Sequence, residues 1–230
     1  FLSVTPGFYF REHYFIMLIP VVSLLVATSL QGIYKYLPIT NRRIRILIPV
    51  LIFTLAVGSS LSQMHTYLFE MSPLSAARLT HGLNPLPESI NIARYIRERS
   101  HPSEKIAVIG SEPQIYFYAQ RKSVTGFIYM YPLMERQRFS LLMQQEMIRE
   151  IESGKPQYLI FIHIPTSWLR RETSHDLILH WFFSYASRYY KQCALVEIID
   201  PSTTRYYWDQ GTLPSRPISP FWISIYKRIP

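Results

Sequence analysis

Residues 14–69 read YFIMLIPVVSLLVATSLQGIYKYLPITNRRIRILIPVLIFTLAVGSSLSQMHTYLF and decide the fold of this chain. Two uncharged runs dominate the stretch, residues 14–34 and residues 46–69. A helix needs about 20 predominantly apolar residues to cross the hydrocarbon layer of a membrane, and each run has that length. The stretch therefore predicts that residues 1–69 form a membrane hairpin with two spanning helices.

The segment between the two runs is basic, with Lys35, Arg42, Arg43 and Arg45. Positive residues in a short loop stay on the cytoplasmic side of the inner or plasma membrane. We therefore expect the turn to face the cytoplasm and everything after Phe69 to be extracytoplasmic. The alternative is a buried helical hairpin in a large soluble core, and the position of the basic turn argues against it.

The net charge of the chain indicates which kinds of partner it binds, and its cysteine count indicates whether it forms a disulfide. The 230 residues carry a net charge of +9, but the basic residues are spread out and no nucleic-acid-binding module is recognisable. We expect no nucleic acid partner, because anionic membrane lipids or a phosphate-bearing lipid suit this charge better. Cys193 is the only cysteine, so no internal disulfide forms, and its apolar neighbours predict a buried thiol.

We expect the first apolar run not to be a signal peptide, because no basic region precedes it. The chain begins at Phe1 rather than methionine, which suggests a piece of a longer protein. Arg11 and His13 lie among aromatic residues just before the first span. A guanidinium fork and a titratable imidazole suit a lipid phosphate, with Tyr14 positioning it. Interfacial snorkelling of Arg11, paired with Glu12, is the alternative.

The rest of the chain predicts an α/β domain. Residues 70–86 are expected to be a connector, because Pro73 and Pro85 discourage a continuous helix. Over residues 87–230, apolar runs alternate with helical patterns, which predicts a three-layer domain with a mostly parallel sheet. The last two strands are expected to pair antiparallel at one edge. The expected strands are residues 106–110, 123–127, 158–163, 193–199, 204–210 and 221–228, and the expected later helices are residues 113–119, 133–153 and 174–190.

The stretch FYFREHYFIMLIPVVSLLVA, residues 8–27, resembles a late transmembrane segment of bacterial polytopic glycosyltransferases of the GT-C superfamily. That group includes relatives of the dolichyl-phosphate-mannose–protein mannosyltransferases and of the lipid A aminoarabinose transferases. The resemblance continues through LNPLPESINIARYIRERS, IAVIGSEPQIYFYAQRKSVTGFIYMYPLME and MQQEMIREIESGKPQYLIFI, and so covers most of the chain. The matching positions near the first span are Arg11, His13, Tyr14, Phe15 and Pro20.

The resemblance implies transfer of a sugar from a polyprenyl-phosphate donor to an extracytoplasmic acceptor, without a cofactor. In that superfamily an acidic residue in the first outer loop serves as the base or binds the acceptor. This loop has no counterpart here, and Glu12 is the only acidic residue before Glu70. We therefore assign no catalytic residue and expect the chain to be inactive alone. It resembles a carboxyl-terminal part of such an enzyme, with Arg11, His13 and Tyr14 at the lipid phosphate.

Polar residues follow two of the expected strands and form a possible accessory site. Ligands of open α/β sheets bind at the carboxyl ends of the strands. Ser111 and Glu112 follow one strand and His163 ends another, so these residues are expected to meet. Gln114 opens a helix whose amides suit a phosphate or a sugar hydroxyl. The alternative is that Ser111 caps this helix and that His163 is an ordinary loop residue.

The absence of several sequence motifs argues against nucleotide-binding and metal-dependent functions, and other residues leave more than one function open. No glycine-rich nucleotide motif, HExxH motif or metal-ligand spacing is present, so no metal is expected. Tyr129, Tyr131 and Trp168 suit a sugar-stacking platform or packing against a membrane leaflet equally well. The alternative to a transferase is a membrane-anchored extracytoplasmic binding or interaction module without catalysis. A structural subunit of an envelope complex is a third possibility.

Overall fold

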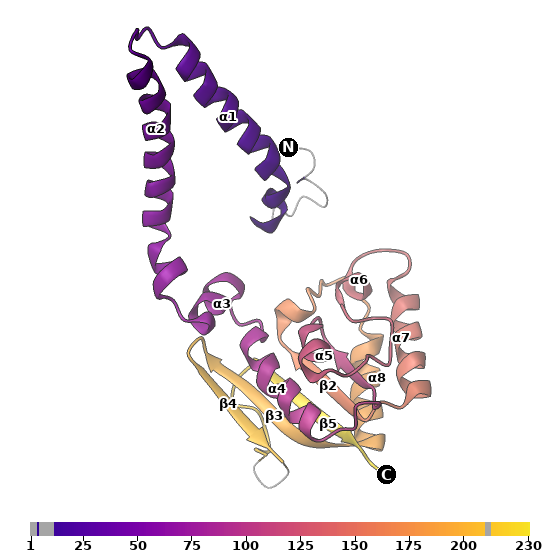
Figure 1. The fold of residues 1–230 in the computed structure, drawn as a ribbon. Coiled ribbons are helices and arrows are strands. Elements are labelled where there is room, and N and C mark those ends of the chain that lie inside the picture. Colours follow the sequence, from indigo (N-terminus) through magenta and orange to yellow (C-terminus); the bar gives the residue numbers. More distant parts are fainter. Residues whose placement is uncertain (1–3, 5–11, 210–212) are drawn as a thin grey trace. The chain divides into compact units, whose positions relative to one another are not determined.

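The computed structural model describes residue 4, residues 12–209 and residues 213–230. The chain divides by its internal contacts into two units, Phe1–Met71 and Ser72–Pro230 (Figure 1). The first contains two long apolar helices, and the second combines helices with a five-stranded sheet. The predicted α/β class and the two apolar helices near the N-terminus are confirmed.

The helices of the first unit begin and end close to the predicted spans. A 3-10 helix, η3 (Glu12–Leu18), leads into α1 (Ile19–Tyr36), and α2 (Arg42–Gln63) is followed by a π-helical turn, η4 (Thr66–Glu70). Both helices are long and apolar enough to cross a membrane, and their apolar side chains are exposed. This exposure is compatible with anchoring in a membrane, since lipid tails would cover such side chains.

The basic residues between the two helices lie in helical turns rather than in the loop. Lys35 is in the last turn of α1, while Arg42 begins α2. The cause is Asn41, whose side chain accepts a hydrogen bond from the Arg43 amide at 3.0 Å and so caps α2. Arg45 then lies over the ring of Tyr34, 4.8 Å from its centroid, and links the two helices.

The second unit begins earlier than predicted. A helix, α3 (Pro73–His81), occupies most of the expected connector, residues 70–86. Pro73 starts this helix instead of preventing one, because proline is well tolerated in a first helical turn and Ser72 caps it. The domain boundary expected at residue 87 therefore differs from the contact-defined boundary at Ser72.

The remaining helices follow their apolar patterns. The predicted helix over residues 133–153 is split in two, because the backbone is extended at Glu135 and residues 135–139 are not helical. The helices of this unit after α3 are α4 (Leu86–Glu98), α5 (Gln114–Ala119), α6 (Tyr131–Met134), α7 (Ser140–Gly154), the 3-10 turn η5 (Pro165–Ser167) and α8 (Leu177–Tyr189).

The sheet is mixed, with the strand order β1-β2-β5-β3-β4. β1 and β2 are parallel, whereas the pairs β2–β5, β5–β3 and β3–β4 are antiparallel. The strands are β1 (Ile106–Ile109), β2 (Tyr158–His163), β3 (Tyr190–Asp200), β4 (Thr203–Trp208) and β5 (Trp222–Arg228).

The prediction of a mostly parallel sheet is wrong, for two reasons. Residues 123–127 contribute only an isolated parallel bridge between Ile106 and Ser123, so a second parallel neighbour of β1 is missing from the described sheet. The final strand inserts between β2 and β3 instead of pairing with β4 at an edge. Ile223, Ser224 and Ile225 are all fully buried, as expected for a strand with both faces covered.

Two apolar clusters lie on opposite sides of β2. Ile160 and Ile162 pack with residues of α4 and α5, while Leu159 and Phe161 pack with residues of α7 and α8. Side chains alternate between the faces of a strand, which explains this division. Cys193 belongs to the first cluster and is buried as predicted, and burial raises the pKa of its thiol.

Candidate functional site

The carboxyl ends of β1 and β2 lie at the same edge of the sheet. The two strands are parallel, with Ile109 opposite Phe161, so the chain segments that follow them are neighbours. Gly110 permits their close approach: a Cβ atom there would lie 2.4 Å from Cγ1 of Ile162 and 2.9 Å from Oγ of Ser167. The predicted accessory residues are therefore at this edge, as expected for an α/β ligand site.

Ser111, Glu112 and Gln114 form one hydrogen-bonded network. The Ser111 amide donates to Oγ of Ser167 at 2.7 Å, and Ser111 Oγ accepts from the Met130 amide at 2.9 Å. The Gln114 amide group donates to the Glu112 carboxylate and also to Oγ of Ser89, at 3.0 Å for the latter. Ser111 thus holds the loop before α6; α5 has no side-chain cap, so the capping interpretation is wrong.

Glu112 is the buried carboxyl group of this network, with 3% of its surface exposed. Burial raises the pKa of Glu112 to about 7, against the lowering effect of hydrogen bonds from Gln114 and Ser167. The nearby Glu88 carboxylate raises it further. A carboxyl group with a pKa near 7 is able to exchange a proton at neutral pH.

This raised pKa predicts that the second unit loses stability as pH increases. The folded chain binds the proton of Glu112 more tightly than the unfolded chain, whose carboxyl has its ordinary pKa of 4.5. Stability therefore falls between pH 4.5 and about 7, by about 3 kcal/mol at roughly 1.4 kcal/mol per unit. Glu112→Gln should abolish this fall, measured as the difference between variant and wild type in urea unfolding at pH 5 and pH 8. Parallel pH profiles for the two proteins would contradict the assignment.

His163 ends β2 but does not join that network. Its imidazole stacks on Trp222 with ring centroids 4.5 Å apart, and its Nδ1 lies 3.0 Å from the carbonyl oxygen of Pro220. In β2, residue 163 shares a face with Phe161, whereas the Glu112 network lies beside α4 and α5. The structure therefore brings three of the four accessory residues together and leaves His163 in a different site.

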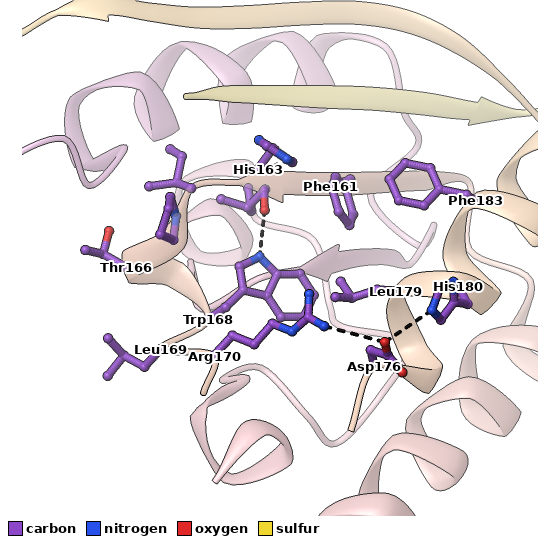
Figure 2. A pocket seen from close by; sticks show the side chains of 13 residues that line it. Phe161, His163, Thr166, Trp168, Leu169, Arg170, Asp176, Leu179, His180 and Phe183 are labelled. Carbon is purple, nitrogen blue, oxygen red and sulfur yellow. Dashed lines mark hydrogen bonds and ion pairs between the residues drawn. The ribbon is translucent and has the colours of Figure 1, made fainter. Parts of the chain in front are cut away.

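That site is a pocket of about 700 Å³ beside the end of β2 (Figure 2). Phe161 and Trp168 are buried side chains of its wall, and Phe183 of α8 is half exposed. The indole N–H of Trp168 donates to the carbonyl oxygen of Ile162 at 2.7 Å, which fixes the ring. The lining residues are Phe161, Ile162, His163, Ile164, Pro165, Thr166, Trp168, Leu169, Arg170, Asp176, Leu179, His180 and Phe183.

The polar groups of the pocket converge on Asp176, the residue before α8. One carboxylate oxygen of Asp176 lies 3.2 Å from Nε2 of His180 and 3.5 Å from Nη2 of Arg170 (Figure 2). All three side chains are about half exposed or more, so they are open to a ligand. The pocket thus combines aromatic surface with a carboxylate, a guanidinium and an imidazole, an arrangement typical of small-ligand sites.

Sequence reasoning named His163 and Trp168 as parts of two other sites, and it missed both this pocket and its polar cluster. Asp176 and His180 are four residues apart at the start of a predicted helix, and such spacing places side chains on one face. Their ion pair was therefore readable from the sequence. The proximity of Arg170 was not, because it depends on the path of a loop.

The predicted platform of Tyr129, Tyr131 and Trp168 is not a single surface. The two tyrosine rings lie close together, with centroids 4.4 Å apart, and the Tyr131 hydroxyl donates to the carbonyl oxygen of Thr166 at 2.6 Å. Trp168 is buried in the wall of the pocket instead.

The predicted lipid-phosphate residues are only partly described. Arg11 lies outside the described residues, as does the side chain of His13. Tyr14 is half-buried in η3. Within the described part of the chain, no group of three or more histidine, cysteine, aspartate or glutamate residues could hold a metal ion.

Comparison with known proteins adds no relative. No protein-family model matches the chain, and neither a curated protein nor a solved structure is significantly similar to it.

Proposed function

We propose that this chain is the carboxyl-terminal part of a GT-C-like membrane glycosyltransferase. In this proposal α1 and α2 cross the inner or plasma membrane, and the second unit is an extracytoplasmic three-layer α/β domain that binds the acceptor. The enzyme transfers a sugar from a polyprenyl-phosphate donor, and its catalytic acidic residues lie outside residues 1–230. The sequence resemblance supplies the reaction class.

The pocket beside β2 is the observation that supports an acceptor-binding role. A sugar ring has an apolar face and a rim of hydroxyl groups, so it needs aromatic surface and charged hydrogen-bonding groups together. Phe183 offers exposed aromatic surface, and the Asp176 carboxylate with Arg170 and His180 offers acceptors and donors. Among the described residues that line the pocket, Asp176 is the one acidic residue, and its contacts with Arg170 and His180 place these three polar groups together for a ligand.

The basic turn supports the proposed orientation. Lys35, Arg42, Arg43 and Arg45 flank the short loop between α1 and α2, and positive loop residues remain in the cytoplasm. The second unit then lies on the outer side, where lipid-linked sugars of this superfamily are used. A cysteine placed at Thr40 should be labelled by an impermeant maleimide only after the cells are opened, in a Cys193→Ser background.

The decisive experiment measures sugar transfer by the protein encoded by the complete gene. Asp176→Asn should raise the KM for the acceptor by about 10-fold or more and leave the donor KM unchanged, because a charged hydrogen bond contributes about 1.5–3 kcal/mol. Arg11→Ala should instead raise the KM for the lipid-linked donor. Glu172→Gln, an exposed change nearby, is the matched control. An unchanged acceptor KM in Asp176→Asn would remove the pocket from the proposal.

A membrane-anchored binding module without catalysis is the second candidate. The contacts of the Asp176 carboxylate with Arg170 and His180 favour it, because a carboxylate already held by two side chains is placed for binding a ligand. Reading the coding DNA upstream of Phe1 distinguishes the two candidates. Further apolar spans with an acidic outer loop support the transferase, whereas a start codon just before Phe1 leaves the binding module.

A further inference from the structure

The imidazole of His163, which lines the pocket at the end of β2, is held in a fixed plane by its neighbour on β5. His163 and Trp222 are partners in the antiparallel register of β2 and β5, so their side chains leave the same face of the sheet. The two rings are stacked, with centroids 4.5 Å apart and an angle of 5° between their planes. The stacking restricts the ring to one orientation.

The hydrogen bond of His163 determines which of its ring nitrogens carries the proton. The Nδ1 atom lies 3.0 Å from the carbonyl oxygen of Pro220. A carbonyl oxygen only accepts hydrogen bonds, so Nδ1 carries the proton, and the neutral ring leaves Nε2 as an acceptor. Within the described residues Nδ1 is the one ring nitrogen of His163 that has a hydrogen-bond partner, and the side chain is exposed. Nε2 is therefore free to accept a hydrogen bond from a ligand.

The carbonyl group that fixes the proton is itself held in place by β3. Glu197 is fully buried, and its Oε1 accepts hydrogen bonds from the amides of Ile218 and Ser219, at 2.5 Å and 3.0 Å. The Ser219 hydroxyl donates to the carbonyl oxygen of Ile198 at 2.5 Å. These three bonds tie the loop to β3 directly before Pro220. The orientation of His163 is therefore preorganised by a buried network.

The free acceptor of His163 complements the other polar groups of the pocket. The guanidinium of Arg170 only donates hydrogen bonds. The carboxylate of Asp176 already contacts Arg170 and His180, at 3.5 Å and 3.2 Å. A ligand that donates a hydrogen bond thus finds in Nε2 of His163 an acceptor that no described residue uses.

We propose that Nε2 of His163 accepts a hydrogen bond from a hydroxyl group of the ligand and so makes the pocket selective for polyhydroxylated rings. Such selectivity favours a sugar with free hydroxyl groups over the same sugar with its hydroxyl groups alkylated, because an alkylated oxygen has no proton to donate. This inference rests on the proposed acceptor-binding role of the pocket. His163 acts here as a specificity-determining residue and takes no part in the transfer reaction.

The test uses the complete chain in nanodiscs, titrated with the methyl α-glycosides of glucose, mannose and galactose and followed by saturation-transfer NMR. His163→Phe keeps a ring on Trp222 but removes Nε2, so it should bind the preferred glycoside about 5-fold more weakly than the wild type. His163→Gln restores an acceptor and should recover most of the affinity. The O-methylated forms of the glycosides should bind the wild type and His163→Phe equally weakly. His101→Phe, which changes an exposed histidine that does not line the pocket, is the matched control.

Two outcomes separate this inference from the acceptor-binding role on which it rests. Equal affinities for the wild type and His163→Phe, with weaker binding by Asp176→Asn, would overturn the role of His163 and leave the pocket as a sugar site. No binding of any of the glycosides to the wild type would overturn both. Nitrogen–proton correlation NMR at alkaline pH checks the geometry without a ligand: His163 should carry its proton on Nδ1, and a proton on Nε2 would overturn the inference.

Discussion

Arg78→Met is expected to lower the free energy of unfolding of the second unit by about 3–5 kcal/mol. Arg78 of α3 pairs with Glu88 of α4, and only 6% and 1% of the two side chains are exposed. Methionine fills similar space but leaves the Glu88 carboxylate buried without its counter-charge. An uncompensated buried charge is among the most destabilising changes in a protein.

The position of Arg78 explains why the loss should affect the whole unit. Its Nε donates to the carbonyl oxygen of Pro201, in the turn between β3 and β4, at 3.2 Å, and its Nη1 donates to that of Asn84 at 3.1 Å. Thr204 of β4 donates to the same Glu88 oxygen at 2.6 Å. One guanidinium thus links α3, the start of α4 and the edge of the sheet.

Urea unfolding followed by tryptophan fluorescence measures this effect. All four tryptophans of the chain, Trp168, Trp181, Trp208 and Trp222, lie in the second unit, so the signal reports this unit alone. Arg94→Met, an exposed change on α4, should alter stability by less than about 0.5 kcal/mol. The double variant Arg78→Met/Glu88→Gln should recover part of the loss, because it removes the unpaired charge. Equal stabilities for Arg78→Met and Arg94→Met would refute the role of the pair.

Local patterns in the sequence predicted the helices and strands that do not depend on contacts with distant parts of the chain. The run YLIFIH predicted β2 at its observed bounds, residues 158–163, because it is apolar up to its last residue, His163, and a glycine and a proline follow the helix before it. The two apolar runs predicted α1 and α2, since a long apolar helix with exposed side chains needs little beyond length and hydrophobicity to be recognised. These predictions required no knowledge of tertiary contacts.

The strand order depended on contacts that local patterns do not contain. The two-residue turn Pro201-Ser202 makes β3 and β4 a hairpin, while a longer connection lets β5 cross to the other side of β3. The strand order also explains why the predicted polar residues lie in two different sites. Ser111 and Glu112 meet Ser167 because β1 and β2 are parallel, yet His163 faces Trp222 because β5 is its neighbour.

Gly110→Ala is expected to destabilise the second unit by about 3 kcal/mol, at the upper end of the usual overpacking effects. The added methyl group would lie 2.4 Å from Cγ1 and 2.6 Å from Cβ of Ile162. Ile162 is fully buried in β2, and its Cβ is attached to the backbone, so rotation of the side chain cannot remove the contact. Either β1 and β2 separate at this edge or the loop after β1 moves.

Gly110→Ala should also disturb the hydrogen bonds of the Glu112 network. It should therefore change the pH dependence of stability as well as stability itself. The new methyl group would lie 2.9 Å from Oγ of Ser167. This oxygen accepts the hydrogen bond from the Ser111 amide. Moving Ser167 removes a donor to Glu112 that lowers its pKa, so the pH-dependent loss of stability should extend to higher pH. Gly126→Ala is the control, because its nearest contact, with a Glu150 oxygen at 3.9 Å, is ordinary. Urea unfolding of both variants at pH 5, 7 and 8 checks this, and an unaltered pH profile in Gly110→Ala would show that Ser167 does not act on Glu112.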